Sequence, residues 1–564
     1  MIEARRKRSR FWAPLGVLAL LAVLAVSCAK SETGSGTGSG GSGGTEGSTA
    51  LGSADTSPDV VLPSAGQPKS GGKLIYGLEA ETDGWDPTSN RWATSGTQVA
   101  LTVFDALVAL DKDLKPQPYL AQSLTPSSDY KEWTIKLRPN VKFHDGTPLN
   151  SAAVKKSVDK FRASPLTGAA AKPIVEVVPV DDLTVKFMMN QPWAVFPSSL
   201  TGQGGVIPAP VMLDNPEGAR HPVGTGPFVF QTWTPDKSLS VTKNASYWRQ
   251  GMPYLDAVEF RPLPDANSRY NSLLSHDIQL TVTSSEELIT RMLADSKEGK
   301  IQSVRSIGNN DLSMVLFNTS KAPFDDIRAR QALAYAIDRK SLSELTGTDP
   351  ALSADSVFQK DSVWYKAQPD YPAFDLEKAK ALAQAYEKDK GQPITFQFGS
   401  TGDPLVLQAV QTLQAQWDQA GIKATIQTSE QATYITNAIT GNYQANIWRQ
   451  FGASDPDGNY IWWTSENANG ALALNMARSK DAKTDEALLK GRATTDQATR
   501  KAAYDEVQAR QTAVLPYIWL SHGRWTAAAD TKLRGIQGTP LPEGGTSAAL
   551  VGGVMSITGM WYET

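Results

Sequence analysis

Apolar and polar positions alternate in several short segments of this chain, and longer segments with a helical repeat lie between them. Residues 72–78 alternate as a first strand, which ends at a loop over residues 83–87. Residues 131–137 and 141–143 alternate on either side of a Pro-Asn turn, so this stretch predicts a β-hairpin. The residues at 144–146, His-Asp-Gly, predict a structural turn after the hairpin rather than a catalytic histidine.

Apolar residues spaced by three and four positions predict helices at residues 327–337 and 405–419. Residues 422–428 alternate again as a strand. In the second helix, Leu405, Val410, Leu413 and Trp417 lie near one face. Gly421 after it suits the C-terminal end of a helix. Helices and strands thus alternate along the chain, which predicts an α/β protein.

The N-terminus carries a separate signal. A cluster of Arg and Lys at residues 5–10 precedes an apolar run at 11–26, and the chain's single cysteine, Cys28, follows. This order predicts a lipoprotein signal peptide over residues 1–27, with Cys28 lipidated as the mature N-terminus. The alternatives are an uncleaved membrane anchor and an ordinary signal peptide. The apolar run, interrupted by Pro14, is shorter than the roughly 20 residues that span a bilayer, and an ordinary signal would leave Cys28 unexplained.

The segment after Cys28 is dominated by Gly, Ser, Thr, Ala and Pro as far as residue 70, and it contains no aromatic residue. Such a composition cannot bury enough surface to fold. We therefore predict that residues 28–70 form a flexible tether between a lipid anchor and a folded body. The body exceeds one typical domain, so two or three lobes are expected.

Charge and chemistry exclude several classes of function. The chain has 55 Lys and Arg against 58 Asp and Glu, so it lacks the basic excess that tracks a phosphate backbone, and nucleic acid is not an expected partner. With one cysteine, an intramolecular disulfide is impossible. The four histidines, His144, His221, His276 and His522, lie far apart and in no metal-ligand spacing. We therefore predict no enzyme, no metal site and no cofactor.

Several ordered motifs resemble one protein family. The longest is EWTIKLRPNVKFHDGTPL at residues 132–149; others are VFDALV at 103–108, PVGTGPF at 222–228, NASYW at 244–248, FNT at 317–319, PFDD at 323–326, RQALAYAID at 330–338 and LPYI at 515–518. Together they resemble the family 5 extracellular solute-binding proteins, which are the oligopeptide-, dipeptide- and nickel-binding components of ABC importers. The resemblance runs from about residue 71 to past residue 520.

This resemblance implies an α/β, two-lobed periplasmic-binding-protein-like fold (type II, cluster C) with two crossing hinge strands and an interlobe ligand cleft. Lobe one would comprise residues 71–312 and 519–564, and lobe two residues 313–518. The expected partners are a peptide or other small solute, the permease and ATPase subunits of the importer, and the membrane through the lipid anchor. A lipid-anchored monomer on the extracytoplasmic face of the bacterial cell membrane is implied.

The densest candidate for ligand contact is the aromatic segment at residues 448–463, which surrounds an Asp-Pro-Asp-Gly-Asn turn. In the peptide-binding branch of the family, an aspartate just upstream of this turn holds the ligand's α-ammonium, whereas this chain has Gly452 there. A free ligand N-terminus should therefore not be required, unless Asp455 or Asp457 substitutes; either could equally be a turn former. The predicted ligand-binding residues are Trp85, Trp448, Arg449, Asp455, Asp457, Tyr460 and Trp462.

The sequence leaves the solute itself open. Peptides or another elongated solute are favoured, while sugars are competitors because tryptophan faces also stack on pyranose rings. A chelated metal or haem is a further alternative. A module of the same fold that regulates the envelope or holds peptides without transport is the alternative from a different class.

Overall fold

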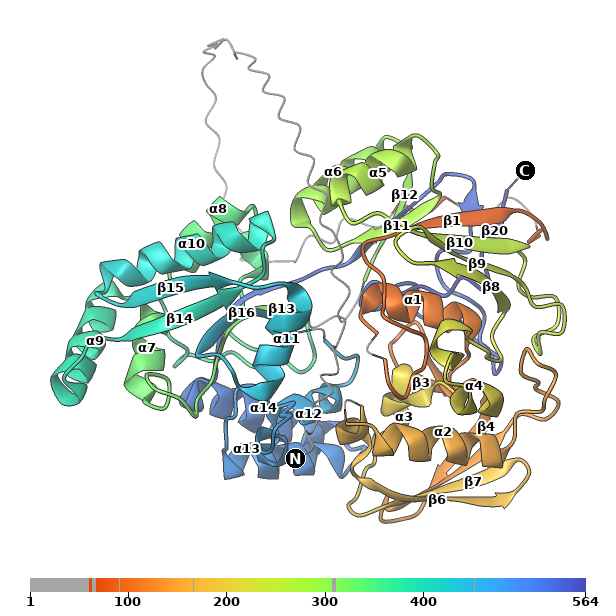
Figure 1. Ribbon diagram of the computed structural model, residues 1–564, viewed down its shortest axis with the longest axis horizontal. Helices are drawn as coiled ribbons and strands as arrows, with labels where there is room; N and C mark the ends of the chain where they lie inside the picture. Colours follow the sequence, from red (N-terminus) through yellow and green to blue (C-terminus); the bar gives the residue numbers. More distant parts are fainter. Residues whose placement is uncertain are drawn as a thin grey trace, which may run out of the picture. The chain divides into compact units, whose positions relative to one another are not determined.

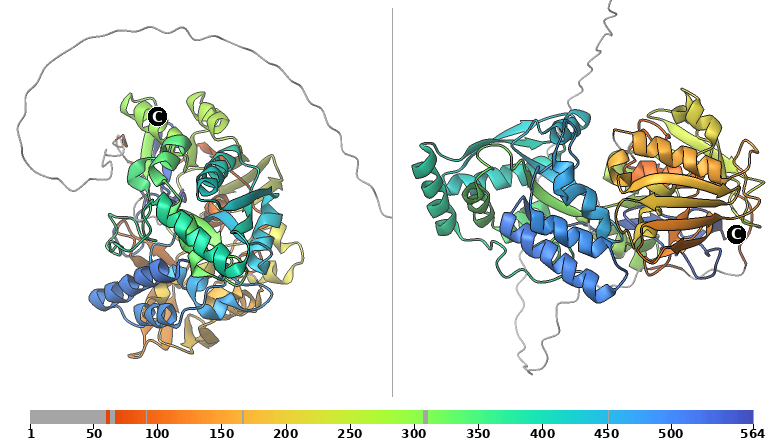
Figure 2. Two further views of the ribbon diagram at one scale, coloured as in Figure 1. Left: turned by 90° about the vertical axis from the view of Figure 1, so that its left-hand side faces the viewer. Right: turned by 90° about the horizontal axis from the view of Figure 1, so that it is seen from below.

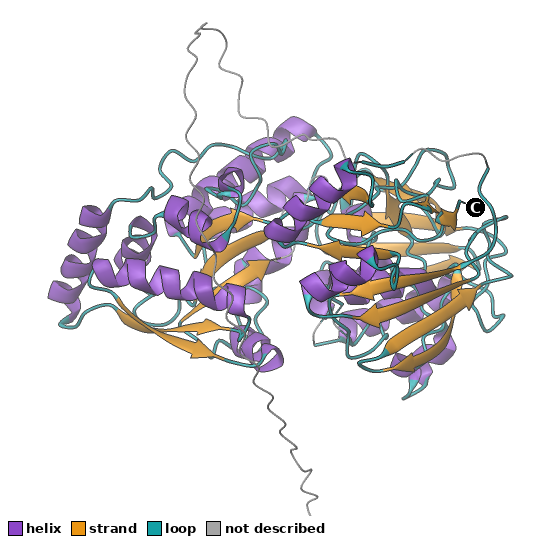
Figure 3. Cartoon of the chain, turned by 90° about the horizontal axis from the view of Figure 1, so that it is seen from above, coloured by secondary structure: helices purple, strands orange, loops and turns teal. Residues whose placement is uncertain are grey.

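The computed structural model describes residues 60–62, 67–90, 92–165, 167–306, 311–450 and 452–563. The predicted signal peptide, Cys28 and the tether up to residue 59 lie outside these residues. Within the described ranges, no helix is both long and apolar enough to cross a membrane. Figure 1 follows the chain through its sheets, and Figure 3 shows helices packed along them, as the predicted α/β class requires.

The largest sheet has seven strands in the order β12-β18-β11-β1-β10-β9-β8. Its central strand, β1, pairs in parallel with β10 and β11 and alternates between two cores. Leu74 and Tyr76 pack with helix α1, whereas Ile75 packs with α5 and α6. The bounds are β1 (Lys73–Leu78), β8 (Phe228–Thr234), β9 (Ser238–Lys243), β10 (Ala257–Pro262), β11 (Leu280–Thr283), β12 (Gln302–Arg305), β18 (Thr526–Ala529), α1 (Thr94–Val103), α5 (Ala266–Leu274) and α6 (Glu286–Lys297).

An antiparallel sheet of four strands, in the order β4-β5-β7-β6, adjoins the first in sequence. Trp133, Ile135 and Leu137 of β5 are buried in one core with helix α2, which lies across this sheet in Figure 1. Asn150 begins α2, because its side-chain oxygen accepts a hydrogen bond from Ala153 N. The bounds are β4 (Ala121–Pro126), β5 (Glu132–Leu137), β6 (Ile174–Asp181), β7 (Thr184–Met189) and α2 (Ser151–Ala163).

The hairpin predicted over residues 131–143 is wrong, because residues 141–143 do not form its second strand. β5 pairs with β4 and β7 and not with residues 141–143. Val141 and Phe143 are buried in the same core as β5, but their backbone closes a local turn. In that turn Phe143 N donates to Thr147 O, and Leu149 N donates to Val141 O. The alternation thus predicted burial correctly and strand pairing incorrectly.

The third sheet has five strands in the order β15-β14-β16-β13-β17. Every fully buried member of its core lies between Leu312 and Leu520. Helices α13 and α14 pack against each other, as the two blue helices in the right-hand view of Figure 2 show. The bounds are β13 (Leu312–Phe317), β14 (Thr395–Ser400), β15 (Lys423–Thr428), β16 (Ala445–Gln450), β17 (Tyr517–His522), α7 (Ile327–Tyr335), α8 (Arg339–Thr346), α9 (Leu376–Lys390), α10 (Pro404–Gln419), α11 (Gln431–Thr440), α13 (Ala482–Arg492) and α14 (Gln497–Val514).

The two predicted helices appear as α7 and α10, and the predicted strand at 422–428 appears as β15. Asp403 begins α10 by accepting two backbone hydrogen bonds, and Gly421 follows it with a positive φ of 76°. Val410, Leu413 and Trp417 are fully buried, as predicted. Leu405 is 59% exposed, whereas its neighbour Val406 packs against the core.

The chain passes twice between the seven-stranded and five-stranded sheets, once between β12 and β13 and once between β17 and β18. The described residues at the ends of these two connections lie side by side. Ser306 N donates to Trp525 O at 2.9 Å, and Gly523 N donates to Asp311 O at 2.8 Å. We call the part with the seven-stranded and four-stranded sheets lobe one, and the part with the five-stranded sheet lobe two.

The remaining elements are short. They are β2 (Val108–Leu110), β3 (Pro116–Pro118), β19 (Leu533–Arg534), β20 (Trp561–Tyr562), α3 (Phe196–Ser199), α4 (Pro210–Asp214), α12 (Tyr460–Trp463), and the 3-10 helices η1 (Gly168–Ala171), η2 (Gln203–Gly205), η3 (Gly218–Arg220), η4 (Pro350–Leu352), η5 (Pro456–Asn459) and η6 (Ser465–Ala468).

Candidate ligand-binding site

A cavity of about 540 Å³ lies between residues of the two lobes. Lobe one contributes α1, the end of α3 and the C-terminal segment 539–558, while lobe two contributes residues 452–461 and Arg492. The volume falls within the roughly 300–1,000 Å³ range of small-molecule sites. The cavity is therefore suited to a small solute that both lobes contact.

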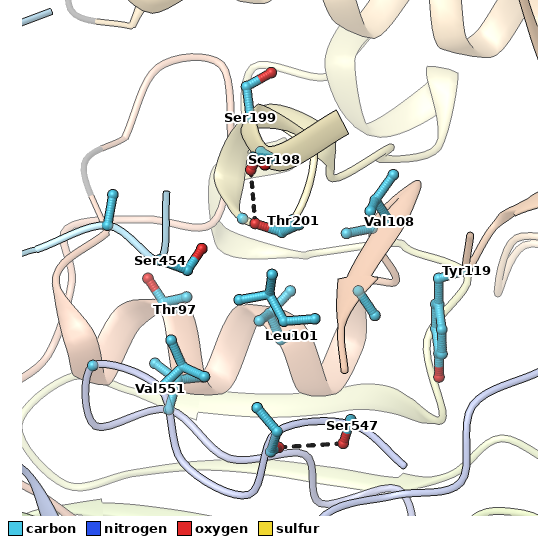
Figure 4. A pocket seen from close by; sticks show the side chains of 18 of the residues that line it. Thr97, Leu101, Val108, Tyr119, Ser198, Ser199, Thr201, Ser454, Ser547 and Val551 are labelled. Carbon is cyan, nitrogen blue, oxygen red and sulfur yellow. Dashed lines mark hydrogen bonds between the residues drawn. The ribbon is translucent and has the colours of Figure 1, made fainter. Parts of the chain in front are cut away.

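Helix α1 forms much of the lobe-one wall. Thr94, Thr97, Leu101 and Phe104 recur at helical spacing and line the cavity on one face of the helix. Figure 4 shows Leu101 and Val108 in the apolar part of the wall. This part of the wall suits apolar atoms of a solute.

The same helix holds the C-terminal segment in place. Gln98 Nε2 donates to Met555 O at 3.0 Å, and Met555 N donates back to Gln98 Oε1 at 2.8 Å. Thr94 Oγ1 donates to Gly552 O at 3.2 Å. These bonds join residues more than 450 positions apart in the sequence and fix Val551, which lines the cavity.

Hydroxyl groups line another part of the cavity. They include Thr97 of α1, Ser454 of lobe two, and Ser198 and Thr201 at the end of α3, which Figure 4 labels. Thr201 Oγ1 donates to Ser198 O at 2.9 Å. Hydroxyls both donate and accept hydrogen bonds, so this part of the wall suits a solute with mixed amide or hydroxyl groups.

Asp455 and Asp457, both predicted ligand residues, line the cavity from lobe two. Asp455 begins η5 and accepts hydrogen bonds from Asp457 N at 2.9 Å and Arg500 Nη2 at 2.6 Å. Burial raises the pKa of Asp455, and the positive charge of Arg500 opposes this rise. Asp455 is thus a turn former and an ion-pair partner as well as a cavity residue.

The Asp457 carboxylate joins the two lobes. It accepts hydrogen bonds from Arg492 Nε at 2.7 Å and Nη2 at 3.2 Å, and from Trp193 Nε1 of lobe one at 2.8 Å. The Arg492 guanidinium lies 4.5 Å from the Trp193 ring and 3.6 Å from the Tyr460 ring. Ala194 N also donates to Arg492 O at 2.8 Å. We call Trp193, Asp457, Arg492 and Tyr460 the interlobe cluster.

A second charged group lies where the two connections run together. Asp311 is 1% exposed and accepts hydrogen bonds from Arg449 Nη2 at 2.9 Å, Trp525 Nε1 at 2.7 Å and Gly452 N at 2.9 Å. Arg449 Nη1 also donates to Ser284 Oγ of lobe one at 2.9 Å. Gly452, where the peptide-binding branch has an aspartate, is thereby held through its backbone by a buried carboxylate.

A fourth acid, Asp105, lines the cavity in lobe one. It accepts hydrogen bonds from Trp248 Nε1 at 2.8 Å, Tyr247 Oη at 3.1 Å and Thr225 Oγ1 at 3.3 Å. Burial raises the pKa of Asp105 to about 7, although these hydrogen bonds and the charge of Arg249 lower it.

Three of the four aspartates around the cavity form ion pairs with arginines. Asp311 is paired with Arg449, Asp455 with Arg500 and Asp457 with Arg492, while Arg249 acts on Asp105 through space. Burying an uncompensated charge is costly, and a solute with a net charge would disturb this balance. The arrangement therefore favours a solute that is neutral or zwitterionic.

The other predicted ligand residues lie outside the cavity wall among the described residues. Trp85 is 3% exposed and packs edge-on against Trp233 at 5.4 Å, within a core of lobe one. Trp448 stacks on Tyr434 at 5.5 Å, and Trp462 packs against the lobe-two core. Arg449 does not line the cavity but forms an ion pair with Asp311, which does. Tyr460 likewise contacts the lining residue Arg492.

The sequence alone missed Asp105, Trp193, Asp311 and Arg492. Trp193 and Asp457 are 264 positions apart, and Arg492 lies at the end of α13 with no motif around it. The one available signal was local: VFDALV, one of the motifs that carried the family resemblance, contains Asp105. Across the described ranges, no three His, Cys, Asp or Glu side chains are grouped so that they could hold a metal ion.

Comparisons with known proteins agree with this architecture. The sequence model of "Bacterial extracellular solute-binding proteins, family 5 Middle" matches residues 115–471. The glutathione-binding protein GsiB of Pectobacterium atrosepticum is 30% identical over 466 residues, which cover 78% of this chain and 87% of that protein. GsiB of Escherichia coli K12 is 30% identical over 432 residues, covering 74% of this chain and 82% of the relative.

Solved structures match over nearly their whole length. The periplasmic binding protein AgaA of A. tumefaciens, in complex with agropinic acid, has a TM-score of 0.75 and 27% identity, covering 87% of this chain and 99% of that one. DppA of Helicobacter pylori with the peptide STSA has a TM-score of 0.75 and 23% identity, covering 88% and 99%. AppA of Bacillus subtilis with a nonapeptide has a TM-score of 0.74 and 20% identity, covering 88% and 100%. The predicted two-lobed fold class is confirmed.

Proposed function

Because the chain belongs to the family 5 extracellular solute-binding proteins of ABC importers, we propose that its solute is a short peptide or a similar amide-rich molecule without net charge. The cavity would hold this solute between the lobes and deliver it to the permease, with the ATPase subunits driving import. The chain's own chemistry would be binding and release, not catalysis.

The observation that carries this proposal is the charge balance around the cavity. Three of the four aspartates in the wall are ion-paired with an arginine, and burial raises the pKa of the fourth, Asp105, to about 7, so the wall offers little spare negative charge to a cationic solute. Hydroxyls and apolar side chains occupy the rest of the wall, which suits peptide groups and small side chains. The relatives named above bind glutathione, peptides and agropinic acid, which supports a solute built from amino acids; glutathione itself carries a net negative charge, so the absence of net charge rests on the cavity wall alone.

We further propose that the body is lipid-anchored through Cys28 on the extracytoplasmic face of the cell membrane. The basic leader, the apolar run and the small residues before the lone cysteine support this anchor. Residues 28–70 would form the tether, residues 71–312 with 519–564 lobe one, and residues 313–518 lobe two. The protein would act as a monomer, because one chain supplies both sides of the cavity.

Native mass spectrometry of the protein purified gently from its own host tests the solute class directly. We expect a retained mass that fragments as a short peptide or an amino-acid conjugate, at one copy per chain. A retained sugar or metal chelate would refute the proposed solute class while leaving family membership intact. A parallel titration with the peptide STSA, glutathione, maltose and a nickel–histidine complex would rank the classes.

A further inference from the structure

Arg492 lines the cavity and has one buried hydrogen-bond donor without a partner among the described residues. Its side chain is 3% exposed, and its Nε and Nη2 atoms are both bonded to Asp457. Its third nitrogen, Nη1, is buried without a hydrogen-bond partner in the described part of the protein. Of the residues with such a buried unpaired polar atom, Arg492 alone lines the cavity among those described.

An unpaired donor on a buried guanidinium is costly, because the group has lost its water and gained no acceptor in return. Buried polar groups that lack a partner in a binding protein are therefore candidates for contact with the ligand. Arg492 lines the cavity wall, so a solute in the cavity would lie against the residue that carries this donor.

We propose that Arg492 anchors the solute by donating a hydrogen bond from Nη1 to a neutral oxygen, such as a peptide carbonyl. This inference rests on the proposed function, which supplies the peptide. Asp457 already neutralises the Arg492 charge, and Asp455 lies two residues away. A solute carboxylate would add a negative charge beside these two aspartates, whereas a carbonyl oxygen accepts the bond without one.

The same side chain connects solute contact to contact between the lobes. The guanidinium lies between the Trp193 ring of lobe one and the Tyr460 ring of lobe two, and Asp457 bonds both Arg492 and Trp193. Solute bound to Nη1 is thus expected to stabilise the arrangement in which the two lobes touch.

The test compares Arg492→Lys with Arg500→Lys. Lysine at 492 keeps the charge beside Asp457 but loses the forked guanidinium and its third nitrogen. Arg500 is a matched control, since it is also a buried arginine paired with a cavity aspartate but does not itself line the cavity. With the peptide STSA as calorimetric probe, we expect R492K to lose about 10- to 100-fold in affinity and R500K less than about threefold.

Two further measurements keep the test decisive. The C-terminally amidated peptide should show the same R492K loss as the free acid; a loss confined to the free acid would overturn the neutral acceptor. Native mass spectrometry should find the host solute retained by wild type and R500K but not by R492K, with similar melting temperatures for all three. If R492K retains the solute, or if both variants lose it equally, Arg492 is not its anchor.

These results also separate this inference from the proposed function. A retained sugar that is lost only in R492K would refute the peptide and leave the anchor standing. A retained peptide that R492K also keeps would support the peptide as solute and refute Arg492 as its anchor. Failure of wild type to bind any retained or added solute would overturn both.

Discussion

Replacing Trp193 with phenylalanine removes one hydrogen bond between the lobes and leaves most of the ring in place. The indole Nε1 donates to the Asp457 carboxylate at 2.8 Å, and both side chains are buried. Phenylalanine can still pack against Phe196, whose ring centroid lies 5.1 Å from that of Trp193. The change therefore tests the interlobe bond while most of the local core remains filled.

The size of the effect follows from the charge on the acceptor. A hydrogen bond to a charged group contributes roughly 1.5–3 kcal/mol to stability. If a loss of about 2 kcal/mol falls only on the state in which the lobes touch, the ratio of that state to an open one drops about 30-fold. Solute dissociation should accelerate by a similar factor, because the solute leaves from the open state.

The assay combines two readouts on the same preparation. Stopped-flow fluorescence gives the dissociation rate of the solute, and small-angle X-ray scattering gives the radius of gyration with and without it. We expect W193F to dissociate faster and to need more solute before its radius falls.

Trp85→Phe is the matched control, because Trp85 is equally buried, at 3% exposed, but packs against Trp233 away from the cavity wall. It should lower the melting temperature without changing the dissociation rate. Equal dissociation rates in W193F and wild type would refute the role given to the interlobe bond. A faster rate in W85F would instead support Trp85 as a ligand residue.

Three further predictions address the anchor, the solute terminus and the buried acid. Cys28→Ala should abolish lipidation, so the protein should leave the detergent phase after phase separation; persistence there after signal cleavage would exclude a lipid anchor. Acetylating a bound peptide's N-terminus should change its binding free energy by less than about 1 kcal/mol, because Gly452 supplies no carboxylate. Breaking a buried charge pair typically costs roughly 2–5 kcal/mol. A hundredfold loss of affinity by calorimetry would show that an acid binds the ammonium. Asp105 has a folded-state pKa raised to about 7 from an ordinary value of 3.8, so the folded state binds the extra proton and its contribution to stability is lost as pH rises between these values. Asp105→Asn should flatten that decline in urea-unfolding free energy between about pH 4 and pH 7, and an unchanged slope would show that Asp105 does not titrate there.

Much of the fold could be predicted because its signals are local. The apolar face of α10 and its glycine stop follow from residues within 17 positions of one another, and the structure reproduces both. The hairpin prediction failed because the pairing of β5 is decided by β7, which begins about 50 residues downstream. Alternation shows that Val141 and Phe143 are buried, but it carries no information about which strand lies beside them.

In the candidate site, too, residues close together in the sequence could be predicted and residues far apart could not. Asp455 and Asp457 could be found because they lie in one short aromatic segment, and both line the cavity. Trp193 and Arg492 could not be found, because they meet Asp457 from 264 and 35 positions away. Trp448, predicted from the aromatic density of its segment, stacks on Tyr434 outside the cavity wall, and its contact with a ligand stays a prediction. Only the packing of both lobes shows which polar groups face the cavity.

The most direct test of the central claim is a titration of the full-length mature protein with the peptide STSA, followed by calorimetry, melting and small-angle scattering together. A solute held between the lobes at a hundredfold excess over its Kd should stabilise the folded state by about 2.7 kcal/mol. The account predicts one peptide per chain, a higher melting temperature and a smaller radius of gyration in the same titration. Tight binding of a sugar or a net-charged chelate with no response to peptide, or stabilisation without any decrease in radius, would contradict it.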